Sequence, residues 1–264
     1  MDGTGASGGR RGPAGRQEAI AEHVLSRGSA TAAELAERFQ VSLMTIHRDL
    51  DELERQGVVR KYRGGVTAQP SGVFESNVGY RMKSMQIEKD AIAAKAVELI
   101  EPGMAVMLDD STTTLALARR LEGITPLTVV TNFLEGLNLL SRVRGIRLMA
   151  LGGDYDPLHN SFLGVSCVEA IESLQVDLCF VSTSAVSGAY AYHQEQHIVS
   201  VKRAMLARAA RNVLLLDHTK LGRTALHRVA PLSVFDRVIV DHGASGEALR
   251  ELDEHKVGYD VVAP

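Results

Sequence analysis

Apolar residues near the start of the chain recur at the spacing of short helices. Leu35, Ala36 and Phe39 share one helical face. Thr31 and Glu34 lie at the start of this segment, and a hydroxyl followed three residues later by a carboxylate forms a capping box, which satisfies the first free amides of a helix. We therefore predict a helix that begins after Thr31. Apolar residues further upstream predict an earlier helix that completes a three-helix core: Ile20, Val24 and Leu25.

A second helix is predicted directly after the first, across a tight turn. It begins at Ser42, a favoured N-cap residue, and ends at about Gln56, because Gly57 favours helix termination. One side of this helix is apolar, and the opposite side carries residues suited to a DNA groove. Arg48 is the best candidate for contact with a guanine edge. The predicted DNA-contacting residues of the first two turns are Ser42, Met44, Thr45, His47 and Arg48.

Residues 58–66 alternate apolar and basic side chains and end in a glycine pair and a valine. This pattern predicts a small β-hairpin, or wing, that carries cations toward the phosphate backbone. Arg60, Lys61 and Arg63 are the predicted phosphate contacts. Residues 16–66 are therefore predicted to form a winged helix-turn-helix domain with double-stranded operator DNA as its partner. The pattern leaves open a winged helix used for protein contacts, or a plain helical pair.

The rest of the chain alternates apolar runs with helical stretches. Residues 67–82 are predicted to be a linker, and a helix is predicted from Lys83 to Glu101. Strands that alternate with helices predict an α/β domain over residues 83–264, with a doubly wound, mostly parallel sheet covered on both faces. The predicted strands are Ala105–Leu108, Leu127–Val130, Ile146–Leu151, Leu178–Val181, Val213–Leu216 and Val238–Val240. The predicted helices between them include Leu115–Leu121, Leu134–Leu140, Ile198–Ala210 and Gly246–His255.

Polar residues gather where these predicted strands end, and ligands of such sheets bind beyond the carboxyl ends of the strands. Two aspartates and a run of hydroxyls follow the first strand at the start of a helix, where free amides and the helix dipole favour an anion. This combination predicts a pocket for a phosphorylated sugar, although an ordinary helix cap would show the same hydroxyl run. The predicted effector-binding residues are Asp109, Ser111, Thr112, Thr113, Thr114, Asn132, Gly152, Gly153, Lys202, Asp217 and Lys220.

Several of these motifs resemble those of the DeoR family of bacterial transcriptional repressors. The run Thr-Ile-His-Arg-Asp-Leu, from Thr45 to Leu50, is similar to the family's Thr-Ile-Arg-Arg-Asp-Leu. Asp109–Thr113 is similar to its Asp-x-Gly-Thr-Thr run, and Asp217–Gly222 to its Asp-x-Ser-Lys-Phe-Gly run. Thr131-Asn132 and Gly152-Gly153 match two further short motifs. The resemblance implies a C-terminal domain similar in fold to ribose-5-phosphate isomerase that binds phosphorylated sugars as effectors.

The chain departs from the family pattern at three positions. His47 replaces an arginine, which removes a full charge at neutral pH and changes the expected operator sequence. Ser111 replaces a glycine, so a left-handed backbone is less favourable there. Ile198 stands where many members have an acidic residue, four positions before the lysine Lys202. The neighbouring segment His193–His197 is a candidate substitute, which would change the sugar that is accepted.

His193 and His197 also have the i, i+4 spacing of a helical metal pair. The sequence identifies no third ligand, and the order of residues found in zinc proteases is absent. We therefore predict neither a metal nor a cofactor.

Composition and charge limit the remaining possibilities. No stretch reaches the roughly 20 apolar residues of a membrane helix, and residues 1–15 lack the apolar region of a signal peptide. We predict a cytoplasmic protein that contacts no membrane and has a disordered arm over residues 1–15. Cys167 and Cys179 are predicted to be buried, reduced thiols. Three basic residues in or beside this arm are candidates for contact with DNA: Arg10, Arg11 and Arg16.

The net charge of −3 is divided unevenly along the chain. Residues 1–66 hold 10 Lys and Arg against 9 Asp and Glu, and the rest holds 19 against 23. A DNA-binding domain so weakly basic makes few phosphate contacts, which predicts a homo-oligomer that reads paired half-sites.

Two functional classes fit the sequence. The first is a repressor of carbohydrate metabolism genes that a phosphorylated sugar releases from its operator. The second is a sugar-phosphate isomerase with an added DNA-binding module. Isomerisation needs a positioned acid–base pair, and the spacing of the residues identifies none. We therefore predict a regulator with no catalytic residues.

Overall fold

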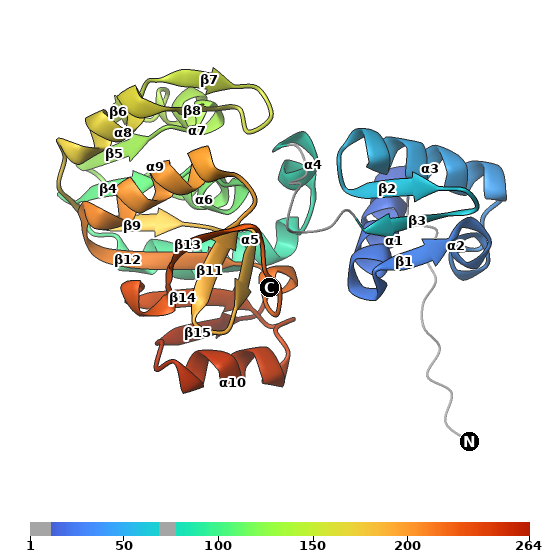
Figure 1. Ribbon diagram of the computed structural model, residues 1–264. Coiled ribbons are helices and arrows are strands. Elements are labelled where there is room, and N and C mark those ends of the chain that lie inside the picture. Colours follow the sequence, from blue (N-terminus) through green and yellow to red (C-terminus); the bar gives the residue numbers. More distant parts are fainter. Residues whose placement is uncertain (1–11, 69–77) are drawn as a thin grey trace. The chain divides into compact units, whose positions relative to one another are not determined.

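The computed structural model describes residues 12–68 and 78–264, which form two compact units that divide near residue 70 (Figure 1). Most of the predicted arm, including Arg10 and Arg11, lies outside the described residues. The predicted arm, residues 1–15, extends too far, because helix α1 (Pro13–Arg27) already begins at Pro13. Proline is favoured at the first helical position, where its missing N–H costs no hydrogen bond.

The N-terminal unit is a three-helix domain with a small sheet. Helices α2 (Ala32–Phe39) and α3 (Leu43–Arg55) follow α1, and both predicted N-caps are present. The Glu34 amide donates to Thr31 Oγ1 at 3.2 Å, and the Thr31 amide donates to Glu34 Oε2 at 2.7 Å, which completes the capping box. The core contains the predicted apolar face, although the side chain of Leu25 lies outside the described part: Ile20, Val24, Leu35, Ile46, Leu50 and Leu53.

The predicted wing is present as an antiparallel hairpin of β2 (Val59–Tyr62) and β3 (Gly65–Ala68). A third strand that was not predicted, β1 (Ser29–Thr31), pairs with β3, so the sheet order is β1-β3-β2. The close pairing requires a glycine at position 65, because a Cβ there would lie 2.6 Å from the carbonyl oxygen of Ala30. The sheet fixes the hairpin against the helices.

The C-terminal unit is built on a seven-stranded sheet in which every neighbouring pair is parallel. The strand order is β15-β14-β12-β9-β4-β5-β6. All six predicted strands are present, with ends that differ by up to four residues, and the seventh strand, β15, was not predicted. The bounds are β4 (Ala105–Leu108), β5 (Leu127–Thr131), β6 (Ile146–Ala150), β9 (Val176–Val181), β12 (Ala209–Leu216), β14 (Arg237–Asp241) and β15 (Tyr259–Val262).

Helices cover both faces of this sheet, which confirms the doubly wound α/β architecture. One apolar cluster joins strand residues such as Val106 and Phe180 to α5 (Gln86–Ala96), α6 (Thr112–Ala118) and α7 (Leu134–Leu140). The other joins residues such as Met107 and Cys179 to the opposite three helices. These are α8 (Val165–Glu172), α9 (Gln196–Ala207) and α10 (Gly246–Glu254). Alternating residues of each strand thus face opposite layers.

Several short elements of this unit escaped prediction. The hairpin β7 (Asp154–Asp156) and β8 (Ser161–Leu163) is antiparallel, as is a separate sheet of β10 (Ala185–Ser187), β11 (Tyr190–His193) and β13 (His227–Pro231). Strands of three to five residues show too few alternations to be distinguished from loops. Among the described residues, no helix is long and apolar enough to cross a membrane.

The helix predicted from Lys83 to Glu101 is divided in the structure. Helix α4 (Val78–Lys83) lies in the predicted linker, and α5 begins at Gln86 after Met85, which has a positive φ of 53°. A 3₁₀ turn, η1 (Val97–Leu99), ends the segment. Val78 anchors α4 against Leu115 of α6 and Phe133 before α7. The linker is therefore shorter than predicted at its C-terminal end, because an apolar contact orders residues 78–83.

Candidate functional site

The outer face of α3 presents the predicted DNA-contacting side chains. Met44 is 66% exposed, and His47 and Arg48 are exposed beside it. Ser42 caps the helix by accepting the Thr45 amide at 3.2 Å, and its Oγ lies 2.9 Å from Thr45 Oγ1. The hydroxyls of Ser42 and Thr45 thus shape the start of the helix, while the other three side chains extend away from the core.

The buried side of α3 contains an ion pair that was not predicted. Asp49 is 3% exposed and accepts Arg16 Nε at 2.6 Å and Gln17 Nε2 at 3.0 Å. These bonds hold α1 against α3. Arg16 therefore ties the helices together, in contrast to the DNA contact that its place beside the arm suggested.

The wing divides its three basic residues between two environments. Arg60 and Arg63 are exposed, Arg63 at the turn between β2 and β3. Lys61 instead forms an ion pair with Asp51 of α3, and its amide donates to Glu54 Oε1 at 2.8 Å. Lys61 thus joins the wing to α3, and its charge is paired with that of Asp51. Arg60 and Arg63 are therefore the exposed cations of the hairpin.

In the C-terminal unit, the sheet order places the predicted strand-end residues along one edge. The chain runs outward from β4 through β5 to β6, and then returns to β9, β12 and β14 on the other side of β4. Strand order therefore reverses between β4 and β9, and such switch points are where doubly wound sheets bind ligands. Asp109 follows β4 and Ser182 follows β9 at this point.

Asp109 is the centre of a buried hydrogen-bond network at the switch point. Its Oδ2 accepts the Ser182 amide at 2.8 Å and pairs with Lys202 of α9. Its Oδ1 accepts the Ser111 amide at 3.0 Å and Thr114 Oγ1 at 2.9 Å. Because both carboxylate oxygens are occupied, Asp109 fixes the β4–α6 loop and the position of Lys202.

Asp110 connects this network to the β7–β8 hairpin. Its Oδ2 accepts Ser161 Oγ at 2.8 Å, and Lys202 Nζ lies 3.4 Å from its Oδ1. Burial raises the pKa of Asp110, but the positive charge of Lys202, the nearby His159 and the Ser161 hydrogen bond together hold its pKa below the usual value. Lys202 therefore lies between two carboxylates, and its charge is neutralised within the protein.

The Asn132 side chain meets the same hairpin. Its Nδ2 donates to the Phe162 carbonyl at 3.0 Å, and its buried Oδ1 has no hydrogen-bond partner among the described residues. Gly153 lies against the end of β8, since a Cβ there would come within 2.2 Å of the Leu163 carbonyl oxygen. Gly152 is exposed next to it. Gly153 thus serves close backbone packing, a Cβ at Gly152 would meet no atom within 4 Å, and Asn132 keeps a free acceptor.

A second group of predicted residues follows β12. Asp217 accepts the Thr219 amide at 3.1 Å and the hydroxyl of the same residue. Burial raises its pKa, but the charges of Lys220 and Lys89 and the Thr219 hydroxyl outweigh this effect and lower the pKa. Lys220 is half-buried beside it. Asp217 and Lys220 therefore form part of the strand-end edge, separate from the Asp109 network.

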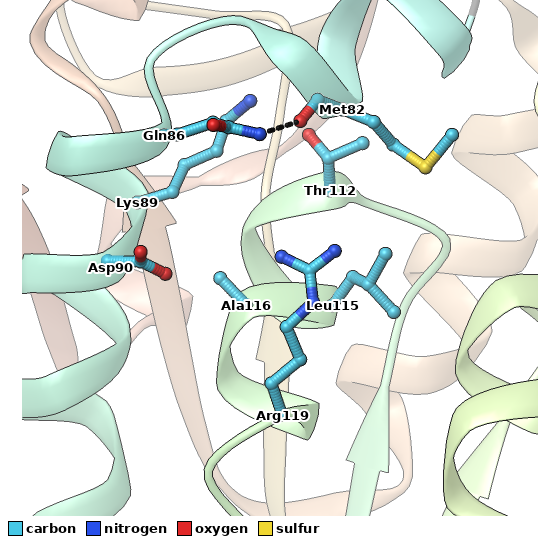
Figure 2. Close-up of a pocket in the computed structure, with 8 residues that line it drawn as sticks. All are labelled: Met82, Gln86, Lys89, Asp90, Thr112, Leu115, Ala116 and Arg119. Atoms are coloured by element: carbon cyan, nitrogen blue, oxygen red, sulfur yellow. Dashed lines mark hydrogen bonds between the residues drawn. The ribbon is translucent and has the colours of Figure 1, made fainter.

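A cavity of about 150 Å³ opens beside α6, and Figure 2 shows its lining residues. It lies between α4, α5 and α6, and Thr112 is the one predicted effector-binding residue among those that line it. The Arg119 side chain extends toward Thr112 in this view, and Gln86 Nε2 donates to the Met82 carbonyl at 3.1 Å. The lining residues are Met82, Gln86, Lys89, Asp90, Thr112, Leu115, Ala116 and Arg119.

Lys89 is a functional candidate that sequence reasoning missed. It is 7% exposed, and its Nζ donates to the backbone carbonyls of Arg81 and Ser84. The sequence did contain a signal for it. Lys89 lies three residues before Ile92, on the apolar face of the predicted helix, where a lysine is unusual. Ser161, which binds Asp110, carried no such signal.

The structure thus defines a class of protein, in which an α/β unit with a seven-stranded parallel sheet follows a winged helix-turn-helix unit. Residues 16–71 match the DeoR-like helix-turn-helix domain, and residues 84–242 match the DeoR C terminal sensor domain. The chain belongs to the DeoR family of transcriptional regulators. Its members are DNA-binding regulators with a small-molecule sensor, so family membership decides against the isomerase alternative.

Relatives align along nearly the whole chain. The HTH-type transcriptional regulator YgbI of Escherichia coli (strain K12) is 35% identical over 91% of this chain and 94% of its own length. The HTH-type transcriptional repressor GlcR of Bacillus subtilis (strain 168) is 32% identical over 86% and 87%. The glycerol-3-phosphate regulon repressor of Escherichia coli (strain K12) is 30% identical over 93% and 98%. The two-domain arrangement is therefore shared with these proteins.

Solved structures are more distant. Ribose 5-phosphate isomerase A from Methanocaldococcus jannaschii matches 50% of this chain and 52% of its own, with 19% identity and a TM-score of 0.37. The translation initiation factor eIF-2B from Pyrococcus horikoshii OT3 matches 87% and 90%, with 11% identity and a TM-score of 0.44. Similarity at this level says nothing about the ligand of the present chain.

Proposed function

We propose that this regulator represses genes of carbohydrate metabolism in the cytoplasm and that a phosphorylated sugar releases it from its operator. The exposed face of α3 carries this proposal, because Met44, His47 and Arg48 extend from a capped helix beside a wing with two exposed arginines. Helix-turn-helix domains insert such a helix into the major groove. Two relatives are named as repressors, one of them of a glycerol-3-phosphate regulon.

The proposed effector site extends from the switch point to the cavity beside α6. Its supporting features are the hydroxyl of Thr112 in the cavity wall, the half-buried cation of Lys220 and the free acceptor Oδ1 of Asn132. A phosphorylated sugar needs cations for its phosphate and acceptors for its hydroxyls. Because Lys202 is neutralised by two aspartates, its proposed role is to hold the loop that carries Thr112.

The proposed active form is a homo-oligomer. Each chain presents few unpaired cations on its DNA-binding face, and Lys61 is already paired with Asp51. Paired half-sites bound by two copies supply the affinity that one copy lacks. The effector then acts by changing the spacing of the two DNA-binding units.

Two sets of variants test the proposal. Arg48→Ala is expected to weaken specific operator binding by about 10- to 100-fold, as expected for loss of a bidentate base contact. Arg55→Ala, a matched change at the other end of α3, is expected to keep normal binding because Arg55 pairs with Glu52. Band-shift titration measures both. Normal binding by Arg48→Ala would place the DNA-reading surface elsewhere.

The effector half is tested with Lys220→Ala and Thr112→Ala. Both variants are expected to bind the operator normally and to lose release by the phosphorylated sugar. Arg250→Ala, which removes an exposed cation on α10, is the control and is expected to respond as the natural chain does. A normal response in both Lys220→Ala and Thr112→Ala would show that the effector binds elsewhere.

A further inference from the structure

Four side chains of types that can bind a metal ion meet at one point outside the proposed effector site. Asp156 ends β7, His159 lies in the turn before β8, Glu195 caps α9 and His197 lies in its first turn. One ligand atom from each residue lies within 4.8 Å of every other. Two imidazoles and two carboxylates therefore converge from segments about forty positions apart in the chain.

The contacts within this cluster alternate between histidine and carboxylate. His159 Nδ1 lies 3.3 Å from Asp156 Oδ2, and His197 Nε2 lies 3.3 Å from the same oxygen. Glu195 closes the ring, with Oε2 at 2.9 Å from His197 Nε2 and Oε1 at 3.6 Å from His159 Nε2. Ligands at about 2.1 Å from a tetrahedral zinc ion lie about 3.4 Å from one another. His159 can offer only one of its two nitrogens to a single ion, and with one ligand atom taken from each residue these atoms lie within 4.8 Å of one another. Small movements of the side chains would therefore form a coordination sphere.

The backbone holds Asp156 in a position suited to binding an ion. Its Oδ1 accepts the amide of Leu158 at 2.8 Å and that of His159 at 3.3 Å. These bonds occupy one oxygen and direct the other, Oδ2, toward both imidazoles. Turn geometry thus orients the carboxylate, as outer-sphere hydrogen bonds do for ligands in metal sites.

Burial differs across the cluster in a way that provides access for an ion. The His159 side chain is 1% exposed, whereas those of Asp156 and Glu195 are 22% and 21% exposed and that of His197 is 47% exposed. The cluster is therefore anchored on the protein side and open on the His197 side. An ion can enter from solvent, and a water molecule can complete its coordination.

From this geometry we propose that Asp156, His159, Glu195 and His197 bind one divalent transition-metal ion of the zinc class. Two imidazole nitrogens with two carboxylate oxygens suit zinc and its neighbours, whereas calcium and magnesium prefer oxygen ligands alone. Of the i, i+4 pair seen in the sequence, only His197 belongs to this site. His159 supplies the second imidazole, and His193 lies outside the group, where its Nδ1 accepts the Glu195 amide at 3.2 Å.

A metal at this point would link the two elements that hold the buried aspartates. The β7–β8 hairpin carries Ser161, which donates to Asp110, and α9 carries Lys202, which pairs with Asp109 and Asp110. The ion would bind the hairpin to the start of α9. Its expected role is to stabilise the loop region beside the proposed effector site, and its binding does not depend on that site.

Metal binding is measured on the full chain with Zn²⁺ and Co²⁺ as probes. The natural chain, stripped with chelator and reconstituted, is expected to retain one zinc per chain by elemental analysis after dialysis. Co²⁺ is expected to give the visible absorption of a four- or five-coordinate nitrogen–oxygen site, and Zn²⁺ is expected to raise the melting temperature. Two variants, His197→Ala and Asp156→Asn, are expected to lower zinc affinity at least about tenfold, since even outer-sphere changes cost 10- to 100-fold.

Asp156→Asn is the sharper variant, because an asparagine oxygen can still accept the two amides of the turn while the anionic ligand is lost. His255→Ala removes an exposed histidine of the same unit and serves as the control, with unchanged zinc affinity expected. Fewer than one zinc per natural chain, or equal affinity in His197→Ala and the natural chain, would overturn the proposal. Loss of binding in His255→Ala alone would assign the metal to another place.

Discussion

Lys202 shows at the scale of one residue how a functional-looking motif can be an internal support. It is 3% exposed and lies between Asp109 and Asp110, which are equally buried. Attraction between the lysine and the two carboxylates offsets the cost of removing these three charges from water, but only while all three groups are present. The network therefore gives the β4–α6 loop one well-defined conformation.

Replacement of Lys202 tests this account. In Lys202→Met, two buried carboxylates lose their cation, and we expect the free energy of unfolding to fall by about 3–5 kcal/mol. Denaturant titration of the full chain, followed through the C-terminal unit, measures the change. Lys83→Met, which alters an exposed lysine at the end of α4, is expected to have almost no effect. Similar stabilities for the two variants would contradict the account.

His218 provides a prediction about pH. Its Nδ1 lies 2.7 Å from Asp241 Oδ2, and this hydrogen bond is the main reason that the pKa of His218 is raised above 6.5. Burial raises the pKa of Asp241, but hydrogen bonds from His218 and Gly243 lower it below 3.8 overall. The His218–Asp241 pair therefore stabilises the fold fully between pH 3.8 and pH 6.5, the ordinary pKa values of the two groups. This stabilisation is lost as pH rises through the raised pKa of His218, or falls through the lowered pKa of Asp241.

NMR titration of the His218 ring measures this effect. We expect the midpoint above 6.5 in the natural chain and a shift back toward that value in Asp241→Asn. A midpoint that does not move in the variant would show that Asp241 is not the cause.

The sequence predicted local features of single residues well and distant pairings poorly. The Thr31–Glu34 capping box spans three positions, and its residue types alone indicate it. The Arg16–Asp49 pair spans 33 positions and the Lys202–Asp109 pair spans 93. No periodicity encodes such pairings, because they arise only when packed elements bring the residues together. The Asp109 carboxylate therefore looked free to bind a sugar until its partners were known.

At the scale of elements, length determined what the sequence could indicate. Six of the seven strands of the parallel sheet were predicted, with ends that differ by up to four residues, whereas the helix predicted from Lys83 to Glu101 is divided. The three-residue strands β7 and β8 were not predicted, although their hairpin carries Ser161 and the turn with His159. Ser161 binds Asp110 of the proposed effector site, and His159 belongs to the proposed metal site. The hairpin that the sequence pattern misses therefore contributes residues to both sites.

The wing gives a prediction at this scale. Arg63 is exposed at the turn between β2 and β3, whereas Lys61 is paired with Asp51. If Arg63 neutralises one DNA phosphate, Arg63→Ala is expected to reduce the log–log salt slope of operator binding by about 0.9 per chain. Lys61→Ala is expected to change the slope less. Binding titrations at several salt concentrations measure both, and an equal reduction would show that Lys61 leaves Asp51 to contact DNA.

The whole molecule combines a DNA-reading unit of nearly balanced charge with an acidic sensor unit. Residues 1–66 carry one more cation than anions, and the rest of the chain carries four more anions than cations. In the proposed function, electrostatic attraction to DNA is local to the exposed arginines of α3 and the wing. This distribution supports the proposal that an assembled oligomer binds specific DNA.

The central claim is that one chain binds its operator and releases it in response to a phosphorylated sugar. The most direct test is fluorescence anisotropy of the full chain on its own upstream DNA, titrated with a panel of phosphorylated sugars and their free forms. We predict tight, salt-sensitive binding that one phosphorylated sugar weakens by about 5- to 150-fold, the usual range of allosteric coupling, while the free sugar has no effect. Specific binding that no phosphorylated sugar alters, or that the free sugar relieves equally well, would contradict the claim.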